Sequence, residues 1–276
     1  MSGEYSGPQD LHLVKELDLK NFDTIIALGG WPDAKRVATR AAEYLRDKLE
    51  AEKIGEIDPA ALYNFVVQRP LVRIEQGLVK YYELPRNELY AWKSKTASND
   101  LLILIGVEPH TNWSRYVESI FHISDVKKTN RIILLGGLID RIPHTVEPQI
   151  SGVATTPRLV EEMKLHGIEP TVYTGPSGIH SYILSESDRR GIPASSLWGH
   201  APEYITDVDS RTAYQLLAKV AAMIYIEVDL GDLKREAELL QKQLDVAMSE
   251  NQAFSQLVQK LELEYKIRKR KPNYIK

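Results

Sequence analysis

The chain has 276 residues, of which 43% are hydrophobic and 26% charged, a composition typical of globular proteins. Its formal net charge of -3 gives no global field that would favour nucleic acid, so no nucleic-acid partner is expected. It contains no cysteine, which excludes disulfides, thiolate nucleophiles and thiolate-bound zinc.

The sequence also gives no membrane signal. The first ten residues lack a basic segment followed by an apolar run, so they do not read as a secretory signal. No apolar stretch approaches the roughly 20 residues that a membrane helix needs. We therefore expect a cytoplasmic protein with no membrane partner.

The first half of the chain predicts strands alternating with helices. Residues 23–30 read as a buried strand that ends in glycines, and residues 34–52 have helical periodicity. Residues 70–94 alternate and are interrupted by Gly77 and by a Pro-Arg-Asn turn, which favours antiparallel strands. Residues 100–108 form the next buried strand, and a helix is expected from near Asn112 to residue 128.

The second half continues the alternation. Strands are expected at residues 131–140 and 195–204, a short strand and turn at 171–178, and helices at 156–166, 179–191 and 210–228. The continuous apolar runs at 25–28, 101–105 and 132–135 predict parallel strands of one sheet, buried on both faces. The fold class is therefore α/β, with helical layers around a sheet made mixed by the hairpin-like section.

The C-terminal segment differs, which divides the chain into an α/β core at residues 1–229 and a helical extension at 230–276. Its apolar positions step by alternating fours and threes, which is a heptad seam with Asn251 inside it. The seam indicates either a coiled coil in a homo-oligomer or a helix packed on its own domain, and the helix should end before Pro272. The seam comprises Leu233, Ala237, Leu240, Leu244, Ala247, Asn251, Phe254, Val258, Leu261 and Tyr265.

The glycine-rich turns carry no phosphate-binding or nucleophile motif. Neither the turn after residue 28 nor the one at 174–178 matches G-x-G-x-x-G, a P-loop or a nucleophile elbow. The dispersed histidines form no i,i+4 ligand pair, so no metal and no cofactor is expected, and no catalytic residue is assigned.

Polar and aromatic residues nevertheless follow several of the expected strands. If these strands are parallel, their carboxyl ends share one edge, where α/β proteins place ligands. The tryptophans at these corners could pack on the following helices or form a binding face. The candidate pocket at this edge comprises Gly30, Trp31, Asp33, Glu108, His144, Gly175 and Gly178.

Read in order, these corners resemble the proteasome assembly chaperone family of the second-subunit type, in its longer prokaryotic branch. The matching segments are GGWPDA at 29–34, VEPHTNW at 107–113, GGLIDRIPHT at 136–145, YTGPSGI at 173–179 and GIPASSLWGHAPEY at 191–204. The resemblance implies a three-layer mixed-sheet fold similar to nucleoside phosphorylases and hydrolases, and a protein-binding role rather than a known reaction.

The resemblance also implies a candidate protein-binding tail, since family members that act on proteasomes can end in a hydrophobic-Tyr-any tripeptide that enters pockets between α-ring subunits. This chain ends Tyr274-Ile275-Lys276, with the tyrosine third from the end instead of second. It also has Glu203 where the branch often has histidine.

The leading hypothesis is a non-enzymatic, self-associating protein that binds other proteins and assists assembly of, or docks to, a proteasome-like complex. One alternative is a phosphorylase- or hydrolase-like enzyme with Asp33, Glu108 or His144 in acid/base or orienting roles. Another is a small-molecule-binding regulator that uses the same pocket without turnover.

Overall fold

A computed structural model describes residues 10–15, 19–95, 99–127 and 129–270 of the chain, and the side chains of residues 124–127 and 270 are not described. The three residues at the C-terminus, expected to form a docking tail, lie outside the described residues. Within the described ranges, no helix combines the length and the apolar character needed to cross a membrane.

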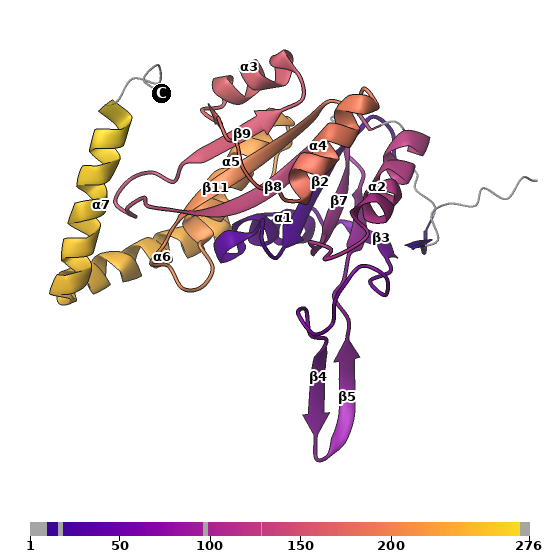
Figure 1. The fold of residues 1–276 in the computed structure, drawn as a ribbon, viewed down its shortest axis with the longest axis horizontal. Coiled ribbons are helices and arrows are strands. Elements are labelled where there is room, and N and C mark those ends of the chain that lie inside the picture. The colour runs from indigo at the N-terminus through magenta and orange to yellow at the C-terminus, as the bar shows by residue number, and fades with distance from the viewer. Residues whose placement is uncertain (1–9, 16–18, 96–98, 128, 271–276) are drawn as a thin grey trace, which may run out of the picture.

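One large mixed sheet organises the described part of the chain (Figure 1). Its strand order is β1-β3-β6-β7-β2-β8-β11-β9-β10, with parallel pairing from β7 to β11 and antiparallel pairing from β1 to β7 and between β11 and β9. The strands are β1 (Leu11–Leu13), β2 (Phe22–Gly29), β3 (Glu52–Ile57), β6 (Glu88–Trp92), β7 (Asp100–Val107), β8 (Arg131–Asp140), β9 (Ile150–Ala154), β10 (Glu169–Pro170) and β11 (Ala194–Pro202).

The centre of the sheet confirms the expectation from the apolar runs. Ile25 of β2 pairs with Ile103 of β7 on one side and with Ile133 of β8 on the other, both in parallel register. Helices cover both faces: α1 (Val37–Lys48), α3 (Pro157–Leu165) and α5 (Ser210–Met223) share a buried cluster with Ile25, whereas α2 (Trp113–Lys127) and α4 (Ile179–Arg189) share one with Ile26. Adjacent residues of β2 thus point into opposite layers, as a strand buried on both sides requires.

Four strands, β1, β3, β9 and the two-residue β10, were not expected from the sequence, and one expected strand is absent. β1, β3 and β9 have no continuous apolar run, and β3 and β9 contain glycine. Residues 171–178, expected to begin as a strand, form an exposed loop after the two-residue β10. Pairing with strong neighbours therefore creates strands that local composition does not indicate.

The expected hairpin is present, but most of it lies outside the main sheet. β4 (Leu71–Glu75) and β5 (Leu78–Glu83) form a separate two-stranded sheet that projects from the body (Figure 1). We call residues 71–83 the hairpin arm. Gln76 and Gly77, the two turn residues, both have positive φ, which matches the twist of paired strands.

The C-terminal segment is two helices, α6 (Gly231–Glu250) and α7 (Gln252–Arg270), which meet at a sharp bend (Figure 1). The placement of Asn251 inside a continuous seam was wrong, because Asn251 is extended, exposed and ends α6. Its Oδ1 accepts the Phe254 N–H at 3.1 Å, so it starts α7. α7 ends at Arg270, before Pro272 as expected.

Both helices pack on their own subunit. Leu233 of α6 belongs to the buried cluster of α1 and α5, and Val258 and Leu261 of α7 are fully buried. Between them, Leu240 and Leu244 are only half-buried. Much of the apolar seam is therefore covered within the subunit, and a role of the remainder in an oligomer stays a prediction.

Replacing Asn251 by alanine removes the side-chain acceptor for the first turn of α7, and we expect a loss of about 1 kcal/mol of stability. Asn251→Ser should keep the cap and serves as the matched control. Chemical denaturation measures the loss, and light scattering should show unchanged mass for both variants. A lower mass for Asn251→Ala alone would restore the seam interpretation.

Candidate functional site

The carboxyl ends of the parallel strands meet at one edge, as the candidate pocket required. The Glu108 N–H, just beyond β7, donates to the Gly29 carbonyl at 2.8 Å, and the Gly137 N–H of β8 donates to the Pro32 carbonyl at 2.7 Å. Gly30 has a φ of +106°, a conformation that only glycine adopts readily, so the chain can leave β2 and pass directly over β8.

Asp33 lies at this edge, but its carboxylate is used to start α1. Oδ1 accepts the N–H groups of Ala38 and Thr39 at 2.7 and 3.2 Å, and Oδ2 accepts the Thr39 hydroxyl. Burial raises the pKa of Asp33, while these hydrogen bonds oppose the rise. Asp33 therefore satisfies backbone groups that a buried helix end would otherwise leave unpaired.

Glu108 has the equivalent role at α4. Its Oε1 accepts the Ile179 N–H at 3.0 Å, the first residue of that helix. Gly178, which precedes the helix, lies beneath Trp31: a Cβ there would lie 3.0 Å from the indole ring and 3.2 Å from Glu108 Oε1. The structure thus brings Gly30, Trp31, Glu108 and Gly178 together; positive φ favours glycine at position 30, and close approach of Trp31 favours it at position 178.

Aromatic side chains dominate the exposed part of this corner. Trp31 is 66% exposed and meets Trp198 of β11 edge-to-face with ring centroids 6.2 Å apart. Trp198 in turn contacts buried His180 at 4.9 Å, and burial lowers the pKa of His180 to about 3, so this histidine is neutral near pH 7.

The loop of residues 171–178 extends this surface, since it ends at Gly178 against Trp31. Val172 is exposed and Tyr173 is 65% exposed, with its hydroxyl donating to the Pro176 carbonyl at 2.8 Å. Gly175 lies against the Tyr173 ring, where a Cβ would be only 2.6 Å from the hydroxyl oxygen. We call the set of Trp31, Val172, Tyr173 and Trp198 the aromatic face.

His144 belongs to a different cluster. Its Nδ1 lies 2.7 Å from the Tyr204 hydroxyl, and its carbonyl accepts from Arg211 at 2.6 Å. The ring stacks on Phe254 of α7 at 5.9 Å, and Nε2 lies 3.5 Å from Asp245 of α6. Burial, followed by the charge of Arg211, lowers the pKa of His144. These contacts position the bend between α6 and α7.

An open cleft of about 550 Å³ lies beside the aromatic face, between the sheet edge, α1 and the base of the hairpin arm. Two of its arginines pair with glutamates: Arg36 donates to both oxygens of Glu43 at 2.9 Å, and Arg86 contacts Glu83. The lining includes Gly30, Asp33, Arg36, Glu43, Arg69, Leu71, Glu83, Pro85 and Arg86.

The histidines that follow strands do not converge. His110 accepts the Asn64 N–H, and His144 and His200 contact Tyr204 and Asp140 respectively. Among the described residues there is no group of three or more histidine, aspartate or glutamate side chains arranged to hold a metal ion.

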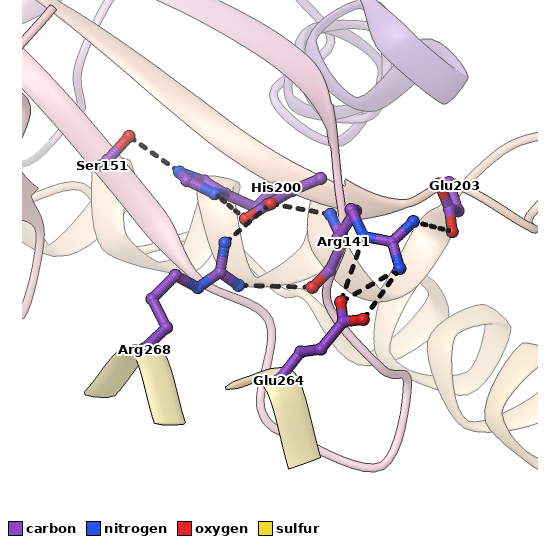
Figure 2. Close-up of polar contacts among 7 residues, drawn as sticks. Arg141, Ser151, His200, Glu203, Glu264 and Arg268 are labelled. Carbon is purple, nitrogen blue, oxygen red and sulfur yellow. Dashed lines mark hydrogen bonds and ion pairs between the residues drawn. The ribbon is translucent and has the colours of Figure 1, made fainter. Parts of the chain in front are cut away.

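The contacts of His200 form a serine–histidine–aspartate chain that the sequence did not reveal (Figure 2). Ser151 pairs with Trp198, two residues before His200, and His200 pairs with Leu138, two residues before Asp140, so all three side chains share one sheet face. Nδ1 lies 2.9 Å from Asp140 Oδ2, and Nε2 lies 2.8 Å from Ser151 Oγ. Because a carboxylate only accepts, Nδ1 carries the hydrogen and Nε2 can accept from the serine.

The backbone N–H of Ser151 is not available as a donor for acyl transfer. The His200 N–H donates to the Gln149 carbonyl at 3.0 Å. Antiparallel pairs alternate between bonded and non-bonded, so Gly199 and Ile150 form a non-bonded pair, and the next pair, Trp198 and Ser151, exchanges both backbone hydrogen bonds. The Ser151 N–H is therefore committed to the sheet and cannot stabilise an oxyanion.

Instead, the hydrogen-bonded group of Ser151, His200 and Asp140 helps to attach α7 to the sheet, as the close-up shows (Figure 2). Asp140 Oδ1 accepts from Arg268 at 3.0 Å, and Arg141 makes a two-pronged contact with Glu264 at 3.0 to 3.2 Å. Burial alone would raise the pKa of Asp140, but the hydrogen bonds from His200 and Arg268 outweigh it and lower the pKa well below 3.8. We call Asp140, Arg141, Glu264 and Arg268 the α7 clasp.

Together, the mixed sheet between helical layers and the aromatic face at its carboxyl edge define an α/β protein with an exposed aromatic surface. The chain belongs to the PAC2 family, whose family model matches residues 27–248. The resemblance to proteasome assembly chaperones inferred from the sequence is thereby confirmed at the level of family and fold. No curated protein matches the chain.

Solved structures of similar proteins agree with this family assignment. A proteasome-assembly chaperone homologue from Mycobacterium tuberculosis is 27% identical, with a TM-score of 0.78 over 86% of this chain and 99% of that one. A PAC2 family protein from Streptomyces avermitilis is 27% identical, with a TM-score of 0.74 over 81% and 94% of the two chains. An archaeal proteasome activator from Pyrococcus furiosus shares the fold at 24% identity, with a TM-score of 0.69 over 86% and 97%.

The α7 clasp predicts that the stability of the protein depends on pH. The pKa of Asp140 is lowered in the folded state, so its ionised form stabilises the fold above pH 3.8 and this contribution is lost as the pH falls below that value. Asp140→Asn should reduce stability at pH 7 by about 2 kcal/mol.

Chemical denaturation at a series of pH values should show the difference from the unsubstituted protein shrinking in acid. Asp245→Asn, at a more exposed carboxylate 3.5 Å from His144, is the control and should have a smaller effect at pH 7. If the stability difference between Asp140→Asn and the unsubstituted protein does not change with pH, the charge of Asp140 does not contribute to stability.

Proposed function

We propose that this PAC2 family member is a non-enzymatic protein-binding protein that docks to a proteasome-like complex or assists its assembly. The observation that carries the proposal is the aromatic face, in which Trp31 is two-thirds exposed on a rigid platform formed by Trp198 and Gly178. Tryptophan and tyrosine dominate the energetics of protein–protein contacts because they bury a large area at low entropic cost. The chaperone homologue among the related structures supports the choice of partner.

The hydrogen bonds made by the polar residues at the same sheet edge favour a protein-binding role over a catalytic one. Asp33 and Glu108 accept backbone N–H groups at the starts of α1 and α4, and His144 is held between Tyr204 and Phe254. An acid/base catalyst must reach its substrate with a free lone pair or proton. Both oxygens of Asp33 and Oε1 of Glu108 are used to start helices, and Nδ1 of His144 faces the Tyr204 hydroxyl.

The small-molecule alternative rests on the open cleft beside the hairpin arm. Its arginine–glutamate pairs would have to be broken before their charges could recognise a ligand. We therefore rank a regulator that binds small molecules below a protein-binding role, and a phosphorylase- or hydrolase-like enzyme below both.

Three further expectations belong to this proposal. We infer that the protein acts as a homo-oligomer and in the cytoplasm. We also infer that the helical extension begins at residue 230, although Leu233 packs into the core, so the extension would act as an attached arm and not as an independently folding unit.

Trp31→Ala should weaken binding to the proteasome α-rings of the source organism by roughly 10-fold or more, as expected for an aromatic hot spot. Surface plasmon resonance measures the change. Tyr225→Ala removes a similarly exposed aromatic residue outside the aromatic face and should leave affinity unchanged. Equal affinity of the Trp31 variant and the unsubstituted protein would exclude the aromatic face as the docking surface.

The C-terminal residues allow a second test. Removing residues 273–276 should leave folding and self-association intact, because chain ends after a proline are seldom part of a packed structure. With its tyrosine offset, the tail is expected to add little to partner binding. If only the intact protein binds α-rings, the tail is the main docking element instead.

A further inference from the structure

Ser151, His200 and Asp140 line an open cleft of about 550 Å³ between the main sheet and α7. Strands of the sheet supply one wall of this cleft, and Tyr265 and Arg268 of α7 belong to the other. The volume lies within the range of small-molecule sites. Ser151 is half-buried and lines the cleft, so a molecule that enters it meets the serine side chain.

The direction of the hydrogen bonds activates the serine oxygen (Figure 2). Asp140 holds the hydrogen of the neutral His200 ring on Nδ1, so Nε2 presents a lone pair to the Ser151 hydroxyl, 2.8 Å away. A base in this position takes up the serine proton while the oxygen forms a new bond. That is the condition under which serine, a weak nucleophile by itself, attacks a carbonyl carbon.

A second serine–histidine pair in the same subunit lacks both the orienting carboxylate and the access. Ser196 Oγ lies 2.9 Å from His180 Nδ1, but both side chains are buried. Among the described residues, Nε2 of His180 has no hydrogen-bond partner. Ser196 is therefore an internal control for Ser151, since it has a histidine beside it and no route for a reagent.

The size of each effect decides what the Ser151 hydroxyl can do. A positioned general base accelerates a reaction by roughly 10²–10⁴-fold over an unassisted group. An oxyanion donor, which the Ser151 N–H cannot supply, contributes roughly another 10²–10³-fold in acyl-transfer enzymes. Ser151 is therefore reactive in comparison with other serines but slow in comparison with an esterase, and it needs an acyl donor whose leaving group is a weak base.

We propose that Ser151 is an acyl-acceptor site, which takes one acyl group from an activated ester or anhydride in this cleft and keeps it. Oγ attacks the carbonyl carbon while its proton passes to His200 Nε2. The bond between that carbon and the leaving group breaks, its electron pair stays with the leaving group, and His200 passes the proton on to the leaving group. An ester forms at Ser151 as the donor is cleaved, with no change in oxidation state.

The acyl group stays because its removal is harder than its addition. Hydrolysis of the serine ester must expel an alkoxide, which is a strong base, and again finds no oxyanion donor in the Ser151 backbone. The modification is therefore stoichiometric and does not make the protein an enzyme. It also lies apart from the aromatic face, so it does not rest on the proposed docking function.

The unsubstituted protein allows a direct test with p-nitrophenyl acetate, an activated ester, followed by peptide mass spectrometry. Ser151 should be acetylated at least about 100-fold faster than Ser249, an exposed serine of α6 whose hydroxyl donates to the Val246 carbonyl at 2.7 Å. Ser196 should stay unmodified. Acetylation of Ser151 no faster than that of Ser249, or no acetylation of Ser151, would overturn the proposal.

Two variants separate the base from its surroundings. His200→Gln can still donate to Asp140 but cannot take up a proton, so acetylation of Ser151 should slow by about 100-fold, with circular dichroism checking the fold. An unchanged rate in this variant would overturn the role of His200. Ser151→Ala supplies the background for p-nitrophenolate release. If the unsubstituted protein shows continuous release that Ser151→Ala abolishes, the acyl group is not retained, and the proposal is wrong.

Discussion

The parallel pairing of β7, β2 and β8 is the constraint on which the rest of the structure depends. It brings the ends of three strands to one edge within hydrogen-bond reach of one another, as the contacts from Glu108 to Gly29 and from Gly137 to Pro32 show. Every helix that starts at this edge then has unpaired N–H groups facing a crowded corner. The carboxylates of Asp33 and Glu108 satisfy them, and the glycines allow the backbone to approach so closely.

This arrangement explains how a corner whose sequence suggests catalysis folds into an exposed aromatic surface. A carboxylate that accepts backbone N–H groups in a buried position is costly to release, because the donors would be left unsatisfied. The exposed remainder of the corner is aromatic, with Trp31 standing on Trp198. The Ser151–His200–Asp140 chain follows the same logic: its hydrogen-bond geometry is that of a triad, yet its serine N–H belongs to the sheet and its aspartate holds Arg268 of α7.

The central strands and their shared edge were predictable because continuous apolar runs and terminal glycines are local signals. The proximity of Gly30, Trp31 and Glu108 followed from the parallel order of the strands, whereas Gly178 reaches the same corner through a loop where a strand was expected. His144 was assigned to the same pocket by its position after a strand, but the loop that follows β8 places it against Tyr204 and Phe254. Asn251 fitted the heptad spacing, and its capping of α7 depends on backbone geometry that spacing does not encode. The contacts of Ser151 required β9, a strand whose glycine-containing sequence gave no clear pattern.

The central claim is that the carboxyl edge binds a protein partner through its aromatic face. Hydrogen–deuterium exchange with and without proteasome α-rings of the source organism tests it without altering the chain. The account predicts slower exchange, on adding α-rings, in peptides that cover Trp31 and residues 171–178, with little change in β9 and α7. Unchanged exchange at the aromatic face, together with protection confined to the hairpin arm or the α7 clasp, would contradict it.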